Sequence, residues 1–239
     1  MIRLHIPQPL SPGAALAPTL DQSRYLTQVM RVKAGDDLLV FNGQDGEWRC
    51  SVAEVLKRGC LLKAEERIRE QILPPDVELI LAVVKKSPLE FAVEKAAELG
   101  VRRIRLVRTA RTQPQTIRLD RLDTIAVESA EQTGRMDVPE IVASEPLDTL
   151  LDGWASDRRL MFCDETGGPP ALRGLPAAGG AAWGILIGPE GGFSPEERAR
   201  LLDMPSATPV SLGPRVLRAD TAAVTALTLW QATLGDWER

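Results

Sequence analysis

Histidine and cysteine are nearly absent from this chain, in which His5 is the only histidine and Cys50, Cys60 and Cys163 are the only cysteines. An odd number of cysteines without a Cys-x-x-Cys spacing fits neither a disulfide framework nor a zinc site, so we expect no bound metal. Because no histidine is available as a base, each cysteine is interpreted as a small buried hydrophobic residue. A Ser-His-Asp hydrolase is disfavoured for the same reason, since His5 lies in an expected first strand.

Long apolar runs are missing as well. No stretch approaches the ~20 apolar residues that a membrane-spanning helix needs. Residues 1–20 lack a cationic start followed by an apolar segment, which a secretory leader would have. We therefore expect a soluble, cytoplasmic protein with no membrane partner. Its 239 residues, 44% of them hydrophobic, suffice for one large domain or two of modest size.

The chain has no excess of positive charge, since its net charge is -4, but its charges are unevenly placed. Between Lys85 and Arg121, ten lysines and arginines face four acidic residues; from Leu122 onward, nine basic residues face eighteen acidic ones. A basic stripe on an acidic protein can still bind a phosphate backbone. A solvated helix face with ordinary strand-end arginines explains the same pattern, so composition leaves both interpretations open.

The first third of the chain predicts short strands and turns with one helix. Helical spacing of apolar residues marks Asp21–Val32, with Asp21 as the expected N-cap. Turn signals at Asn42-Gly43 and Asp45-Gly46 separate strands whose lengths are typical of a small barrel. Pro74 and Pro75 then interrupt any regular element. We expect a domain boundary there, with domains at residues 1–72 and 76–239.

The second part of the chain changes to an α/β pattern. A buried strand is expected at Val77–Val84, a helix from Ser87 through Leu99 and a further strand at Arg103–Val107. Another strand is expected at Arg159–Cys163, and the residues Gly167–Gly180, rich in Gly, Pro and Ala, predict a loop.

A Gly/Pro loop, Gly188-Pro189-Glu190-Gly191-Gly192, follows the apolar strand Ile185–Ile187. Open α/β sheets bind ligands at the carboxyl ends of their strands. The loop lacks the Lys-Ser/Thr of a P-loop and the G-x-G-x-x-G spacing of a dinucleotide fold. Ser194 is the expected N-cap of the next helix, with Pro195 at its first position. A loop of this kind is by itself more often structural than functional.

A second loop, Ser211–Arg218, repeats this arrangement after the next strand. Its side chains Leu212, Val216 and Leu217 could flank a flat heterocycle while backbone groups contact the edge of that heterocycle. Arg218, at a helix start, could hold an anion or form a capping or interface salt bridge. Two such loops in tandem predict one shared ligand site.

The two loops, read as Leu-Ile-Gly-Pro-Glu-Gly-Gly and Leu-Gly-Pro-Arg-Val-Leu-Arg-x-Asp-Thr-Ala, resemble the cofactor-binding half of the RsmE family. That family comprises ribosomal RNA uridine-N3 methyltransferases of the SPOUT (α/β-knot) class. Upstream segments that begin at Tyr25, Phe91 and Glu128 extend the resemblance over nearly the whole chain. Two departures stand out: Asp220-Thr221 where the family usually has Glu-Thr, and Ala110 where an acidic residue usually precedes Arg111.

The resemblance implies an α/β fold with a C-terminal SPOUT trefoil-knot domain, an N-terminal PUA-like β-barrel, a homodimer whose partner completes the active site, and S-adenosylmethionine as the cofactor. On this resemblance the cofactor-binding residues are Ile187, Gly188, Pro189, Glu190, Gly191, Gly192, Leu212, Gly213, Val216, Leu217 and Arg218. Arg218 is the expected catalytic residue that orients the uracil, and the general base stays open between Glu190, Asp220 and no protein base. Residues expected to contact RNA phosphates are Arg24, Arg31, Lys33, Arg111 and Arg135.

The sequence therefore predicts methyl transfer from S-adenosylmethionine to N3 of a uridine in small-subunit (16S) ribosomal RNA, either as naked RNA or in the assembled 30S subunit. Two alternatives are a non-catalytic RNA-binding or ribosome-assembly protein that retains the knot, and an α/β enzyme that places another nucleotide in the same loops.

Overall fold

The computed structural model describes residues 1–175 and 182–237. The chain forms two compact units, one of Met1–Leu73 with Ala130–Val138 and the other of Pro74–Ser129 with Pro139–Arg239. The domains proposed from the sequence, 1–72 and 76–239, differ from these units in the segment Ala130–Val138. That segment groups with the first unit through hydrogen bonds between residues far apart in the chain, which sequence order does not reveal.

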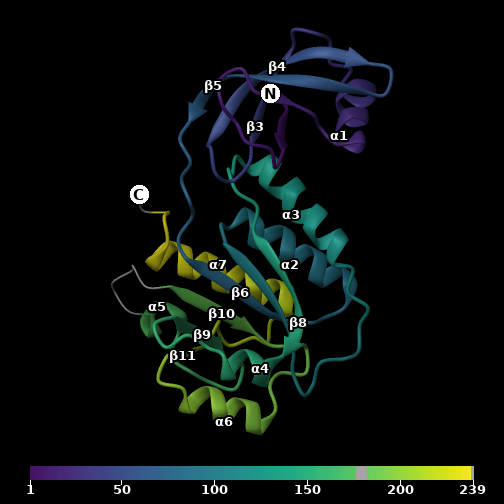
Figure 1. Ribbon diagram of the computed structural model, residues 1–239. Helices are drawn as coiled ribbons and strands as arrows, with labels where there is room; N and C mark the ends of the chain where they lie inside the picture. The colour runs from purple at the N-terminus through teal and green to yellow at the C-terminus, as the bar shows by residue number, and fades with distance from the viewer. Residues whose placement is uncertain (176–181, 238–239) are drawn as a thin grey trace. The chain divides into compact units, whose positions relative to one another are not determined.

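The first unit contains a five-stranded sheet (Figure 1). Its order is β1-β3-β4-β5-β2, with bounds β1 Arg3–His5, β3 Asp37–Phe41, β4 Glu47–Leu56, β5 Gly59–Arg69 and β2 Ala15–Leu16. Only β1 and β3 pair in parallel; the other neighbours are antiparallel. Three register shifts interrupt the long β4–β5 pair. Such bulges bend a strand, so the sheet curves around one apolar core, in which Leu38, Val40 and Leu62 are fully buried.

The expected helix Asp21–Val32 is shorter than predicted and changes its winding. It consists of α1 (Leu20–Arg24) followed by a π-helical turn, η1 (Tyr25–Val29). The N-cap is Thr19 and not the predicted Asp21: the Thr19 hydroxyl accepts the Gln22 N–H at 3.2 Å, and the Gln22 side chain accepts the Thr19 N–H at 3.0 Å. This reciprocal pair satisfies two backbone donors, which a cap at Asp21 would leave open.

Arg3 connects the barrel strands to the last turn of α3 (Leu119–Thr133) and the residues after it. Its guanidinium donates to the Glu47 carboxylate at 2.6 Å and to the backbone carbonyls of Ala130, Glu131 and Arg135 at 2.8 to 2.9 Å. The Glu47 side chain is only 3% exposed. Hydrogen bonds to charged groups are stronger than neutral ones, so Arg3 helps to attach residues 130–138 to the first unit, together with the bonds from His5 to Glu131 and from Arg69 to Gly134.

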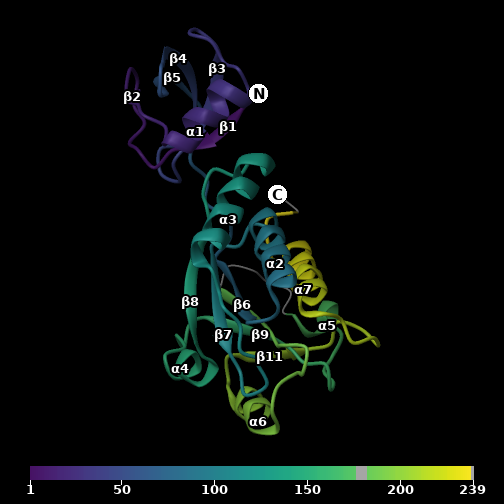
Figure 2. The ribbon, with the colours of Figure 1, turned by 90° about the vertical axis from the view of Figure 1, so that its right-hand side faces the viewer.

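The second unit is a six-stranded, fully parallel sheet of order β11-β9-β10-β6-β7-β8. Its strands are β6 Val77–Ala82, β7 Arg103–Arg108, β8 Glu140–Pro146, β9 Arg159–Cys163, β10 Trp183–Ile187 and β11 Ala207–Val210. Its remaining helices are α2 Lys86–Glu98, α4 Leu147–Asp152, α5 Ala171–Gly174, α6 Pro195–Asp203 and α7 Ala219–Leu234. Helices α2 and α7 cover one face and α4 and α6 the other, which Figure 2 shows edge-on. Because both faces are covered, β6 and β10 are buried along their whole length, as parallel strands usually are.

Most of the predicted elements of this unit are present with small shifts in their bounds, and β9 has the predicted bounds. Strand β8 was not predicted, since this edge strand is half-exposed and lacks an apolar pattern. The predicted loop Gly167–Gly180 contains the short helix α5, and its residues 176–180 lie outside the described residues. Over the described ranges, no helix is long and apolar enough to cross a membrane.

The Arg3→Met substitution is expected to destabilise the first unit by about 3 kcal/mol, because it leaves the buried Glu47 carboxylate with Arg69 as its remaining ion-pair partner and removes the donor to three carbonyls. Native-state hydrogen exchange of the β3 amides measures the change. Arg3→Lys is the matched control: it keeps the charge but not the fork of donors, so we expect a smaller loss. Unchanged protection in Arg3→Met would contradict this role.

Candidate active site

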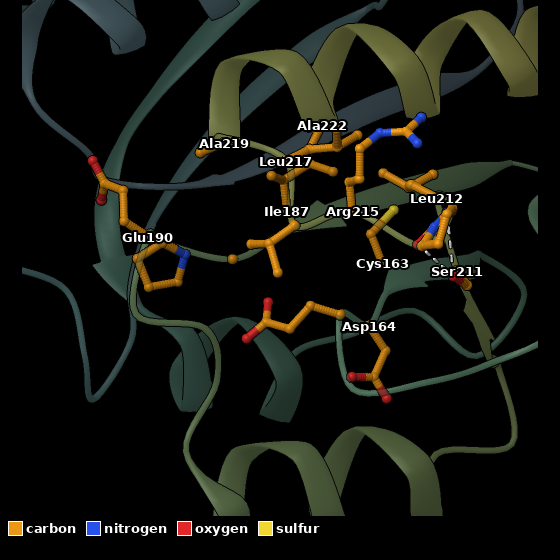
Figure 3. A pocket seen from close by; sticks show the side chains of 16 residues that line it. Cys163, Asp164, Ile187, Glu190, Ser211, Leu212, Arg215, Leu217, Ala219 and Ala222 are labelled. Atoms are coloured by element: carbon orange, nitrogen blue, oxygen red, sulfur yellow. Dashed lines mark hydrogen bonds between the residues drawn. The ribbon is translucent and has the colours of Figure 1, made fainter.

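Three strands of the second unit end at one edge of the sheet, because β9 lies between β10 and β11 and all three run parallel. The segments that follow them meet around one pocket (Figure 3). The lining residues are Cys163, Asp164, Glu165, Ile187, Gly188, Pro189, Glu190, Ser211, Leu212, Gly213, Pro214, Arg215, Val216, Leu217, Ala219 and Ala222. This is the position at which open α/β sheets bind their ligands.

Most of the residues predicted to bind the cofactor line this pocket: Ile187, Gly188, Pro189, Glu190, Leu212, Gly213, Val216 and Leu217. Gly191, Gly192 and Arg218 lie next to it in the chain without lining it. Further lining residues were not predicted from the sequence: the end of β9 with the two residues after it, Cys163 to Glu165, and also Ser211, Pro214, Arg215, Ala219 and Ala222. A signal for the first of these was present, since the predicted strand Arg159–Cys163 also ends in a polar, Gly-containing stretch.

The loop after β10 is fixed by the start of α6. Ser194 is the N-cap, as predicted, with its hydroxyl accepting the Glu197 N–H at 3.2 Å and Pro195 following it. The Glu197 side chain, in turn, accepts the Ser194 N–H at 2.8 Å through Oε2 and the Ala110 N–H at 2.7 Å through Oε1. Both carboxylate oxygens of Glu197, which is only 9% exposed, therefore accept a hydrogen bond. Glu197 connects the loop after β7 to the loop after β10.

Gly192 cannot be replaced by a larger residue without rearrangement. Its φ is +67°, and an added Cβ would lie 1.8 Å from Oε1 of Glu165. The glycine thus allows the segment after β9 to approach the loop after β10 closely.

The last residue of β9 and the two residues after it differ in how their surroundings shift the pKa. Burial raises the pKa of the Cys163 thiol to about 12. Burial would also raise the pKa of Asp164, but hydrogen bonds from Arg198 and Thr166 lower it below its ordinary value. Figure 3 shows the Asp164 carboxylate directed toward α6, which carries Arg198. Burial first, and the Asp164 carboxylate second, raise the pKa of Glu165, while Arg111 opposes the shift.

The expected catalytic residues have different surroundings. Arg218 is the N-cap residue of α7; its exposed guanidinium forms no ion pair or hydrogen bond within residues 1–175 and 182–237. The Arg218 side chain therefore forms no helix cap and no ion pair within the described part of this chain. Glu190 is exposed, and its carboxylate points away from Ile187 and Leu217 in Figure 3. Asp220 accepts the backbone N–H of Thr221 at 2.8 Å within the first turn of α7.

Four of the five arginines and lysines expected to contact RNA are exposed: Arg24, Arg31, Lys33 and Arg111. Arg111 also donates to the Gly191 carbonyl at 2.8 Å. Arg135 differs, because its side chain is 8% exposed and forms a two-pronged ion pair with Asp137 at 2.7 and 2.9 Å. The Arg135 guanidinium is therefore held in an ion pair within the first unit. No group of three or more metal-ligating side chains occurs among the residues described.

Comparison with known proteins defines the class to which this fold and pocket belong. A family model described as an RNA methyltransferase domain matches residues 71–231, and one described as an RNA methyltransferase PUA domain matches residues 18–65. A methyltransferase structure from Legionella pneumophila with bound S-adenosylmethionine has 30% sequence identity and a TM-score of 0.88, covering 98% of each chain. The class is thus that of two-domain RNA methyltransferases with a PUA-like barrel.

Curated relatives specify the family. The ribosomal RNA small subunit methyltransferase E of Rickettsia conorii is 30% identical over 206 residues, 85% of this chain and 83% of the relative. The protein of the same name from Synechocystis is 31% identical, covering 92% of this chain and 74% of the relative. The chain belongs to the ribosomal RNA small subunit methyltransferase E family. The predicted family, fold class and enzyme class are confirmed.

Native Cys163 is expected to resist alkylation. A thiol whose pKa is raised from 9.0 to about 12 has about a thousandfold less thiolate at neutral pH, and the thiolate is the reactive species. Iodoacetamide labelling followed by peptide mass spectrometry measures this directly, with urea-unfolded protein as the control. Cys163 labelling at the rate of an ordinary thiol would mean that the pocket is less closed around it.

Proposed function

We propose that this chain transfers a methyl group from S-adenosylmethionine to N3 of a uridine in small-subunit ribosomal RNA. The observation that carries the proposal is the pocket at the ends of β9, β10 and β11, formed by the loops whose sequences are typical of the family. Its support comes from the relatives' names and from the S-adenosylmethionine held by the Legionella structure.

The residues present fit this cofactor. Ile187, Leu212 and Leu217 offer apolar surface for a flat base, and the glycine-containing loop offers backbone donors and acceptors. The carboxylate of Glu165 lines the same pocket and receives no hydrogen bond from the described residues. A negative group that receives no hydrogen bond suits a ligand that carries positive charge. When bound, the cofactor supplies an electrophilic methyl group, so the protein must chiefly align the acceptor and help remove a proton.

Arg218 is the proposed catalytic residue. Its guanidinium is exposed, unpaired among the described residues and located at the start of α7 beside the pocket-lining Leu217 and Ala219. There it would hold a carbonyl oxygen of the uracil and stabilise the negative charge that develops as N3 loses its proton. Glu190, Asp220 or solvent would accept that proton. Because N3 lies on the pairing edge of uracil, the target base has to be unpaired or extruded first.

The proposal also covers the RNA contacts, the assembly and the cellular location of the protein. Arg24, Arg31, Lys33 and Arg111 would contact phosphates of the RNA, as naked ribosomal RNA or in the 30S subunit, and a homodimer would complete the active site. Ribosomal RNA as the substrate gives the cytoplasm as the place of action. A non-catalytic RNA-binding or assembly protein is the alternative, and turnover distinguishes the two.

Arg218→Ala is expected to lower the methylation rate at least a hundredfold while leaving cofactor affinity unchanged, because the residue acts on the acceptor and does not line the pocket. Methyl transfer to small-subunit RNA gives the rate, and calorimetry with S-adenosylmethionine gives the affinity. Arg218→Lys keeps the positive charge but lacks the paired N–H donors of the guanidinium, so it should recover part of the rate. Wild-type protein that binds the cofactor but does not methylate would favour the non-catalytic alternative.

Cofactor affinity is expected to increase with pH through the raised pKa of Glu165 and then to level off. A bound cation favours the ionised form of Glu165. Where the carboxyl group of the free protein is protonated, binding therefore releases its proton. This coupling applies at pH values from below 4.5 up to the raised pKa of Glu165. Calorimetry across this range tests the prediction. Glu165→Gln should abolish this pH dependence and weaken binding about fivefold at neutral pH, the effect of ~1 kcal/mol between two charges in water. An unchanged pH profile in Glu165→Gln would exclude Glu165 as the titrating group.

A further inference from the structure

The short helix of the first unit exposes apolar side chains that its sequence spacing would lead one to place in the core. Leu26 alone faces the core and is fully buried, whereas Tyr25 is 43%, Val29 66% and Met30 43% exposed. Tyr25 is the only tyrosine of the chain. In a π-helical turn, residues four and five positions apart share a face, so Tyr25, Val29 and Met30 form one apolar surface, which we call the η1 patch.

The backbone under the η1 patch departs from an ordinary helix. The Met30 N–H bonds to the Tyr25 carbonyl at 2.9 Å, which closes the π turn, and the Thr27 hydroxyl bonds to the Ser23 carbonyl at 2.7 Å. Shortly after the end of the helix lies Arg31, the only non-glycine residue with positive φ in the described part of the chain, at +56°. Glycine or asparagine suits this position better. Local irregularities of this kind concentrate at functional sites.

Basic residues adjoin the η1 patch in the chain, and two more lie on a turn beside α1. Arg24, Arg31 and Lys33 come from the helix and the residues after it. Lys57 and Arg58 come from the β4–β5 turn, which lies beside α1 in Figure 1. Gly59, the next residue, lies so close to α1 that an added Cβ would contact the Ser23 hydroxyl oxygen at 3.5 Å.

The acidic residues nearby are already engaged. Asp21 pairs with Arg24 at 3.3 Å, and Asp36 accepts the Lys33 backbone N–H at 2.7 Å. Neither contact involves Arg31, Lys57 or Arg58.

We infer that the η1 patch is a stacking surface for an unpaired nucleotide of the RNA, with Tyr25 against the base and the surrounding cations on the flanking phosphates. An aromatic ring beside apolar side chains within a basic rim matches the chemistry of single-stranded nucleic acid, whose bases stack while its backbone is held electrostatically. An apolar protein partner would not need Arg31, Lys57 and Arg58, which are unpaired among the described residues, near the patch. The inference rests on the proposed function, since it names the RNA feature that the first unit recognises.

The test uses the full chain and two probes, a fluorescein-labelled single-stranded oligoadenylate and an RNA duplex of the same length. Tyr25→Ala is expected to weaken binding of the single strand about tenfold and to leave the duplex unaffected, because only the single strand offers an unstacked base. Tyr25→Phe should retain the wild-type affinity, and Tyr25→Leu, which keeps apolar area without the aromatic face, should not. Ile68→Ala is the matched control, an exposed apolar residue near the other end of β5.

Salt dependence separates stacking from phosphate contact. Tyr25→Ala should leave the slope of log affinity against log salt unchanged, whereas Arg31→Gln should reduce it by about one. Equal loss for single strand and duplex in Tyr25→Ala, or a lower salt slope, would overturn the stacking role. A change in sedimentation instead of RNA affinity would show that the η1 patch joins copies of this chain, which also overturns it.

Failure of this inference differs from failure of the proposed function. Unchanged RNA affinity in Tyr25→Ala, together with normal cofactor binding and methylation by the wild type, would reject the stacking surface alone. Loss of single-strand binding in Tyr25→Ala, with no cofactor binding by the wild type, would support the stacking surface while rejecting the enzyme.

Discussion

The parallel pairing of β9 with both β10 and β11 is the constraint on which the candidate site depends. Every strand in a parallel sheet ends at the same edge as its neighbours, so three segments that are distant in sequence arrive at one place. Cys163 to Glu165, Ile187 to Glu190 and Ser211 to Leu217 then supply the lining of one pocket. An antiparallel neighbour would have sent one of these segments to the opposite edge. The chemistry of the pocket therefore follows from strand direction before it follows from any single side chain.

Loops at such an edge need fixing, because glycine-rich backbone is flexible. Here buried polar side chains hold them. The two carboxylate oxygens of Glu197 accept backbone N–H groups of two different loops. Asp164 accepts hydrogen bonds from Arg198 and Thr166. Removing one partner from such a buried group leaves an unsatisfied polar atom, which typically destabilises by about 1 to 3 kcal/mol. The site is thus rigid where the loops meet. The exposed side chains of Glu190, in the pocket lining, and of Arg218, beside it in the chain, form no ion pair or hydrogen bond with other described residues.

The sequence revealed those parts of the site that local chemistry determines. Strand, glycine and N-cap signals located the loops after β10 and β11, and the Ser194 cap was confirmed. The segment after β9 was missed because the strand order β11-β9-β10 is a tertiary property. The ion pair of Arg135 with Asp137 was not predicted, because sequence cannot distinguish an exposed arginine from one held against a carboxylate. Residues 130–138 belong to the first unit through the Arg3 contacts, which span more than a hundred residues and leave no local signal. The fold class itself came from family resemblance, since periodicity does not specify how six parallel strands are ordered.

The two departures from the family pattern have physical explanations in the structure. At Ala110, where an acidic side chain is usual, the group in use is the backbone N–H, which donates to Glu197. Any residue except proline supplies that donor, so alanine preserves the connection between the loops. At Asp220, the shorter carboxylate still lies in the first turn of α7 and accepts the Thr221 N–H. A negative group there stabilises the helix start whether it is aspartate or glutamate. The Asp220 carboxylate already accepts a hydrogen bond within its own helix, whereas the Glu190 carboxylate forms none to any described residue and is the freer of the two.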